Sequence, residues 1–101
     1  MEIDENDVTI RDEFLGEGYG IPTPAGREAV ELFRTTENIL LENTYTGKTV
    51  AALLHDLRAG KLNGKTTLYW NTLNSRDLSA GTTGIDPRDL PPEFLPLFNQ
   101  G

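Results

Sequence analysis

Residues 38–72 place two β-prone runs on either side of one amphipathic helix, and this order restricts what the chain can fold into. The apolar run Ile39–Leu41 comes first and the β-rich run Thr66–Trp70 comes last. Between them, apolar residues recur at the i, i+3, i+4, i+7 spacing of a buried helix face, namely Val50, Leu53, Leu54 and Leu57. We expect this helix to run from near Gly47 to near Gly60. Strand, helix and strand in this order predict a βαβ unit with parallel strands.

The preceding part of the chain adds one more strand candidate and one more helix. The β-branched run Val8–Ile10 is a short strand candidate. Thr23 is typical of an N-cap and Pro24 of a first helical turn, so we expect a helix over Pro24–Thr36. Its buried stripe would be Ala29, Val30, Leu32 and Phe33. The predicted fold class is therefore α/β: a βαβαβ fragment of a twisted parallel sheet with flanking helices.

The length and the open sheet edges indicate a partial domain. A chain of 101 residues can form one small domain. A sheet of three strands has two open edges, which are normally covered or paired, so we expect residues 1–101 to be a single partial domain. Residues 76–101 are expected to form an irregular tail, in which residues 91–98 build a short helix that docks Phe94, Leu97 and Phe98.

Composition excludes several classes of function. The net charge of −7 argues against a nucleic-acid partner, because phosphate neutralisation needs clustered Lys and Arg. There is no cysteine, so disulfide scaffolds and thiolate sites are excluded. No apolar run approaches the roughly 20 residues that span a bilayer, and the acidic N-terminus does not resemble a secretory signal. We expect a cytoplasmic protein with no membrane partner and no metal site. The single histidine, His55, is expected to be structural or exposed.

Two hydroxyl-bearing loops, residues 44–46 and 72–75, would lie at the carboxyl ends of neighbouring strands, where parallel sheets bind ligands. One candidate ligand is a nucleotide, because Gly47-Lys48-Thr49 imitates the end of a phosphate-binding P-loop. That motif needs a glycine five positions before Gly47, and this position is Glu42, which would repel phosphate. The alternative is a glycine at a helix start followed by a solvated lysine.

Four segments in order carry a more specific resemblance. They are residues 18–23 (GYGIPT), 39–41 (ILL), 45–48 (YTGK) and 68–72 (LYWNT). Their order and spacing resemble the C-terminal part of the D-cysteine desulfhydrase and 1-aminocyclopropane-1-carboxylate deaminase family. The resemblance covers residues 10–72, and the Tyr-Thr-Gly-Lys element is its most specific part. It implies a pyridoxal-phosphate enzyme of the tryptophan-synthase-β fold, of which this chain is about the last third.

The resemblance also implies roles for individual residues. Tyr45 and Tyr19 match the two catalytic tyrosines on the substrate side of the cofactor ring, and Thr72 matches the hydroxyl that faces the ring nitrogen. Thr46 and Gly47 would also contribute to cofactor binding. Each residue has a structural alternative: a packed ring for the tyrosines, and a capping or turn hydroxyl for the threonines. Thr46 stands where the deaminases carry glutamate, which favours the desulfhydrase branch.

The implied activity is a lyase or deaminase reaction, with β-elimination of a small amino acid to a 2-oxo acid, ammonia and, from D-cysteine, sulfide. The lysine that binds the cofactor covalently belongs to the N-terminal portion of the family, and Lys48, Lys61 and Lys65 do not match it. We therefore expect this chain to be inactive alone, and to need that portion as a partner, with a homodimer as a further assembly. The residues Leu73-Asn74 replace two glycines of the family and leave the substrate open. The alternative function is a stand-alone α/β binding or assembly module without catalysis.

Overall fold

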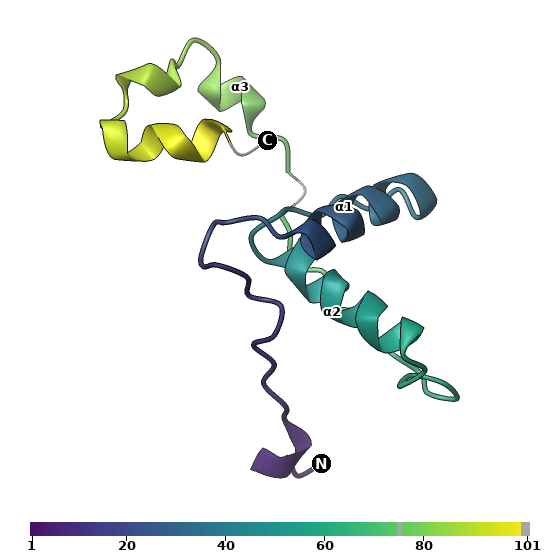
Figure 1. Cartoon of the computed structure of the whole chain (residues 1–101). Coiled ribbons are helices and arrows are strands. Elements are labelled where there is room, and N and C mark those ends of the chain that lie inside the picture. Colours follow the sequence, from purple (N-terminus) through teal and green to yellow (C-terminus); the bar gives the residue numbers. More distant parts are fainter. Residues whose placement is uncertain (75, 100–101) are drawn as a thin grey trace.

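The computed structural model describes residues 1–74 and 76–99, and its regular elements are all helical. Two helices of three turns and more, α1 (Pro24–Thr36) and α2 (Thr46–Arg58), form the centre of the molecule (Figure 1). The shorter helices are η1 (Glu5–Asp7), α3 (Ser79–Thr82), η2 (Pro87–Asp89) and η3 (Pro92–Asn99). None of the helices formed by residues 1–74 and 76–99 has the length and apolar character that crossing a bilayer needs.

The predicted βαβαβ sheet is wrong, because the described residues contain no strand. All three strand candidates, Val8–Ile10, Ile39–Leu41 and Thr66–Trp70, lie outside regular structure. A strand is stable only when its N–H and C=O groups pair with a neighbouring strand, and these runs have no such partner among the described residues. The side chains of these runs are correspondingly exposed to solvent, with Ile10 92% and Leu68 82% exposed.

Helix α1 has the predicted bounds because its start and stop signals are local. The Thr23 hydroxyl accepts a hydrogen bond from the Gly26 amide at 3.0 Å, which makes Thr23 the N-cap. At the other end, Asn38 adopts the left-handed conformation with φ of 54°, and the Ile39 amide turns back to the carbonyl of Phe33. Asparagine tolerates this conformation better than most residues.

Helix α2 starts one residue before its expected beginning and ends at Arg58, two residues before Gly60. Gly60 has a φ of 75°, the left-handed conformation that ends a helix without a side-chain clash. The amide of Lys61 then donates to the carbonyl of Asp56 at 3.0 Å. The predicted stop signal is thus confirmed within two residues.

The core is small and lies where the N-terminal halves of α1 and α2 cross. Its buried residues are Ala29, Leu41, Val50 and Ala51, packed against Phe14, Val30, Phe33, Leu54 and Tyr69. Glycine at position 47 permits the crossing, because a Cβ there would lie 2.8 Å from the Glu42 carbonyl and 3.2 Å from the Gly26 carbonyl. The two helices diverge toward their C-terminal ends (Figure 1), so the expected stripes are buried only near the crossing, and Leu57 is 51% exposed.

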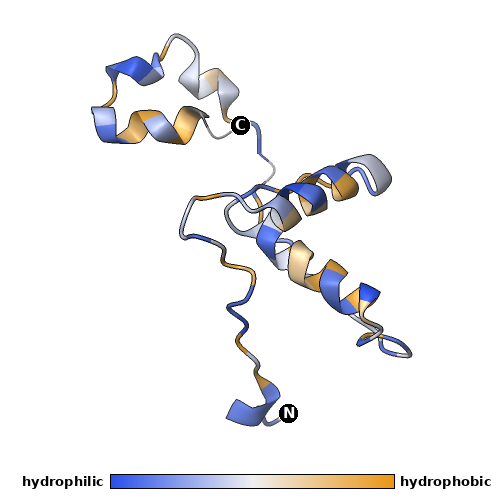
Figure 2. Ribbon diagram, viewed as in Figure 1, coloured by the Kyte–Doolittle hydropathy of each residue, from blue (hydrophilic) through white to orange (hydrophobic). Residues whose placement is uncertain are grey.

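The arm before α1 and the segment after residue 74 extend away from this centre. Figure 1 shows α3, η2 and η3 grouped apart from α1 and α2. The short helix expected near the C-terminus is present as η3, but Phe94 is 48% and Phe98 56% exposed, so the docking expected of them is not seen. Hydrophobic residues also lie along the arm and η3 (Figure 2). The division into one partial domain with a tail from residue 76 stays a prediction.

Candidate functional site

A glycine-rich loop, residues 16–22, carries Tyr19 to the start of α2. Gly16 and Gly20 have a φ of 73°, which favours glycine over every other residue. At Gly16 the space is closed as well, since a Cβ would lie 2.4 Å from Cγ2 of Thr23. Thr23 therefore caps the first turn of α1 and also lies against the loop.

The loop brings together the two tyrosines singled out from the sequence. The Tyr45 hydroxyl donates a hydrogen bond to the Tyr19 hydroxyl at 2.9 Å. Their rings meet edge to face, with centroids 5.8 Å apart at 67°. Both rings are open to solvent, Tyr19 at 80% and Tyr45 at 58% exposure. The alternative of a ring packed in the core is therefore not what the structure shows for either residue.

The hydrogen bond from Tyr45 to Tyr19 raises the pKa of Tyr45, because the bond requires the phenol proton. Burial, the electrostatic effect of Tyr19 and the negative charge of Glu42 act in the same direction. Tyr45 is thus a neutral donor near pH 7. The hydroxyl hydrogen of Tyr19 is not used in this bond and can be donated to a ligand.

Two cavities flank the tyrosine pair. One, of about 320 Å³, is lined by Tyr19, Gly20, Pro22, Asn43, Thr44 and Leu97. The other, of about 300 Å³, has walls from the arm and from α2 that include Phe14, Tyr45 and Lys48. Each tyrosine therefore lines one space the size of a small ligand.

Glu42 organises the start of α2, a role that the sequence alone did not reveal. Its carboxylate accepts hydrogen bonds from the amides of Thr44, Tyr45 and Thr46 at 2.5, 2.7 and 2.6 Å. Burial acts to raise the pKa of Glu42, but these hydrogen bonds outweigh it, and the pKa lies below its ordinary value. A carboxylate at a helix N-terminus is also stabilised by the helix dipole.

Thr46 and Gly47 are part of the same helix start. The Thr46 hydroxyl accepts from the Glu42 amide at 2.8 Å, and Thr46 is buried. This is the capping role that the sequence left open as an alternative. Gly47 packs against α1, as described above. Their roles in cofactor binding stay predictions.

The nucleotide alternative loses support from this geometry. In a P-loop, free backbone amides at the helix start bind the phosphates, whereas here Glu42 already binds those amides. The expected solvated lysine is also wrong: Lys48 is 8% exposed, and its Nζ donates to the carbonyls of Leu15 and Gly18 at 2.7 and 3.1 Å.

Thr72 lies outside this cluster of contacts. It is exposed, in the irregular segment that follows the turn after α2, and makes no hydrogen bond to another described residue. Ser75, the last residue of the predicted hydroxyl-bearing loop, lies outside the described residues. The structure therefore joins Tyr19 to Tyr45 and leaves the role of Thr72 a prediction.

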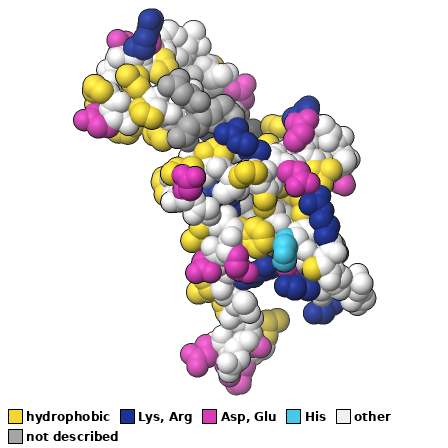
Figure 3. All heavy atoms as spheres, viewed as in Figure 1, with side chains coloured by type: hydrophobic (Ala, Val, Ile, Leu, Met, Phe, Trp, Pro, Cys, Tyr) yellow, Lys and Arg dark blue, Asp and Glu magenta, His cyan; other side chains and the backbone are white. Residues whose placement is uncertain are grey.

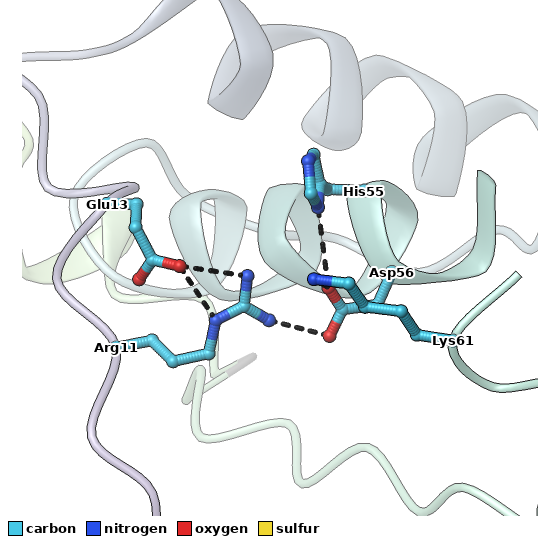
Figure 4. Close-up of polar contacts among 5 residues, drawn as sticks. All are labelled: Arg11, Glu13, His55, Asp56 and Lys61. Carbon is cyan, nitrogen blue, oxygen red and sulfur yellow. Dashed lines mark hydrogen bonds and ion pairs between the residues drawn. The ribbon is translucent and has the colours of Figure 1, made fainter. Parts of the chain in front are cut away.

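A second polar cluster ties the N-terminal arm to α2 (Figure 4). Arg11 donates to Asp56 at 2.6 Å and also pairs with Glu13 at 3.2 Å, while Lys61 lies 3.9 Å from Asp56. Burial acts to raise the pKa of Asp56, but hydrogen bonds from His55 and Arg11 outweigh it and hold that pKa below its ordinary value. His55 is half exposed, as expected for it. Sequence spacing does not indicate a pair 45 residues apart.

The other acidic residues of the arm face solvent, and Figure 3 shows acidic side chains on the arm. Residues 1–74 and 76–99 contain no group of three or more His, Asp or Glu side chains placed to hold a metal ion.

Comparison with known proteins identifies a relationship over part of the chain. No family model matches. The D-cysteine desulfhydrases of Salmonella newport and Salmonella agona are each 39% identical to this chain over 57 residues. This chain is related to D-cysteine desulfhydrase. The resemblance noted in the sequence is thereby confirmed as a relationship to that family.

The match to D-cysteine desulfhydrase covers 56% of this chain and 17% of the relatives. The chain thus matches about a sixth of their length. Any run of 57 residues in a chain of 101 must contain residues 45–57, because it starts at residue 45 or earlier and ends at residue 57 or later. Tyr45 and most of α2 therefore belong to the related segment.

Proposed function

We propose that this chain forms the substrate-facing part of a pyridoxal-phosphate-dependent desulfhydrase that acts on a small amino acid such as D-cysteine. The observation that carries the proposal is the related segment, which includes Tyr45. The hydrogen bond between Tyr45 and Tyr19 supports it, because it gathers two exposed phenols beside cavities of small-ligand size. In this proposal the product set is a 2-oxo acid, ammonia and sulfide.

We infer that the described residues supply only the substrate side of such a cofactor site. No described lysine is available for a covalent link inside a cavity, since Lys48 is bound to two carbonyls, and Lys61 and Lys65 are exposed in the turn after α2. The amides at the start of α2 bind Glu42 and so do not bind a phosphate. We therefore assign the lysine and the phosphate site to a further portion of the enzyme, which is the partner of this chain. Bound pyridoxal phosphate supplies the electron sink for β-elimination.

The tyrosines would act on the amino-acid substrate. Tyr45 holds its proton toward Tyr19, and Tyr19 offers its own hydrogen outward, so the pair can hold a carboxylate or deliver a proton. Thr72 remains the candidate for the hydroxyl that faces the ring nitrogen. Thr46 and Gly47 would shape the site through the helix start that they build.

A chimera tests the proposal. Residues 10–72 of this chain, which contain Tyr19, Tyr45 and Tyr69, would replace the corresponding residues of the Salmonella newport D-cysteine desulfhydrase. We expect the chimera to bind pyridoxal phosphate and to release sulfide from D-cysteine. A folded chimera that binds the cofactor but releases no sulfide from D-cysteine would contradict the proposal.

A second candidate function, assembly without catalysis, is favoured by the exposed apolar residues. Trp70 is 77% exposed and Leu68 82% exposed in a segment without regular structure. In this alternative the chain binds a protein partner through these residues. Retained sulfide release in the chimera would favour the enzyme, whereas an inactive chimera that still assembles would favour the binding role.

A further inference from the structure

Lys48 is a buried cation that the proposed chemistry does not use. It is 8% exposed and sits in the first turn of α2, where the helix dipole disfavours positive charge. No carboxylate of a described residue lies within 4.0 Å of its ammonium group. A cation buried in this way is a poor source of stability, because losing its hydration costs several kcal/mol.

The contacts of Lys48 are to the loop that carries Tyr19. Its Nζ donates to the carbonyl of Leu15 at 2.7 Å and to that of Gly18 at 3.1 Å. Residues 16 and 17 lie between these two carbonyls, and Gly18 directly precedes Tyr19. The ammonium group therefore links the first turn of α2 to both sides of the bend that presents Tyr19.

The residue directly before this helix is Tyr45, the N-cap of α2. The two tyrosines that meet are 26 residues apart in sequence, and Gly16 of the loop lies close to Thr23. Removing the ammonium group would leave the loop carbonyls to water and release the loop from α2, while the core between α1 and α2 stays packed.

We propose that Lys48 is a positioning residue that holds the glycine-rich loop against α2, so that the Tyr19 hydroxyl reaches the Tyr45 hydroxyl. This inference deepens the proposed function and rests on it for its meaning, but the geometry can be tested without cofactor or substrate. We expect a specific effect of removing the ammonium group: the tyrosine contact is lost while the packing of α1 against α2 is kept.

The test is NMR spectroscopy of the full chain with labelled tyrosine rings, comparing Lys48→Met, Lys48→Arg and the control Lys65→Met. In the unaltered chain we expect a nuclear Overhauser effect between the rings of Tyr19 and Tyr45. Lys48→Met should abolish it and return the pKa of Tyr45 toward the ordinary phenol value of about 10. Lys48→Arg, which keeps a donor, should restore both, and Lys65→Met should change neither.

Phe33 and Tyr69, whose ring centroids lie 6.0 Å apart, both pack against the core between the helices, so their contact reports that core in the same spectra and should persist. A Lys48→Met variant that keeps the tyrosine contact and the raised pKa overturns the proposal. If this variant does not fold, Lys48→Gln takes its place, because glutamine has a shorter side chain with an amide donor. A tyrosine contact in Lys48→Gln that is as strong as in the unaltered chain also overturns the proposal. If the NMR results are as expected but the chimera is inactive, the proposed function is rejected and the positioning role of Lys48 still holds.

Discussion

At the scale of single residues, the site depends on positions whose importance comes from distant contacts. Tyr19 and Tyr45 can be singled out from the sequence through the resemblance, but their hydrogen bond cannot, because it joins two loops. From the sequence, Glu42 is only a mismatch to a P-loop, and Lys48 is only a candidate solvated lysine. The partners of Glu42 and Lys48 are backbone groups, which cannot be identified from the residue types in the sequence.

Gly47→Ala should destabilise the chain by about 1–3 kcal/mol, because a Cβ there would overlap atoms that cannot move freely. Two of the nearest atoms, at 2.8 and 3.2 Å, are backbone carbonyl oxygens. Urea unfolding followed by circular dichroism measures the change. Gly81→Ala is the matched control, since nothing lies within 4 Å of that position. Equal losses for both variants would contradict the close approach of α1 and α2.

Glu42→Gln should lower the free energy of unfolding by about 1 kcal/mol near pH 7, because it removes the charge from three hydrogen bonds at the start of α2. The pKa of Glu42 lies below its ordinary value of 4.5, so its stabilisation is present above pH 4.5 and is lost as the pH falls through the folded-state pKa. The difference between the variant and the unaltered chain should therefore shrink in acid. A difference that stays constant with pH, or one matched by Glu17→Gln, would argue against this role.

At the scale of elements, local signals predict the helices and long-range pairing decides the strands. The bounds of α1 follow from Thr23, Pro24 and the apolar spacing, all within one segment. The runs Ile39–Leu41 and Thr66–Trp70 have the composition of strands, but strand formation needs a partner that composition does not supply. The sequence therefore predicts the helix pair and does not show whether a sheet forms around it.

The arm is a testable element because one ion pair joins it to α2. Arg11→Gln should speed proteolysis within residues 1–13, since it removes the 2.6 Å contact with Asp56. Limited proteolysis with mass spectrometry measures the rate. Arg88→Gln is the control, because its ion pair with Asp86 is local to η2. An unchanged cleavage rate in the Arg11 variant would show that the arm is held by other contacts.

At the scale of the whole molecule, the chain exposes more surface than a compact domain. Its accessible surface is 8412 Å², whereas a folded monomer of this mass has about 5,700 Å². Its radius of gyration is 16.8 Å, compared with about 13 Å for a compact chain of this length. Among residues 1–74 and 76–99, the four buried apolar residues of the core are few for a chain of this length. This surface agrees with the proposed need for a further portion of the enzyme.

Tyr45→Phe in the chimera, with Tyr69→Phe as control, tests directly whether the tyrosine pair acts on the substrate. Tyr69 keeps its ring against Phe33 without its hydroxyl, so that variant should retain sulfide release. Tyr45→Phe should lower the rate constant for sulfide release from D-cysteine by about 10²–10⁴-fold, the usual contribution of a positioned proton donor, with cofactor binding unchanged. Equal rates for the two variants would contradict the claim that the tyrosine pair acts on the substrate.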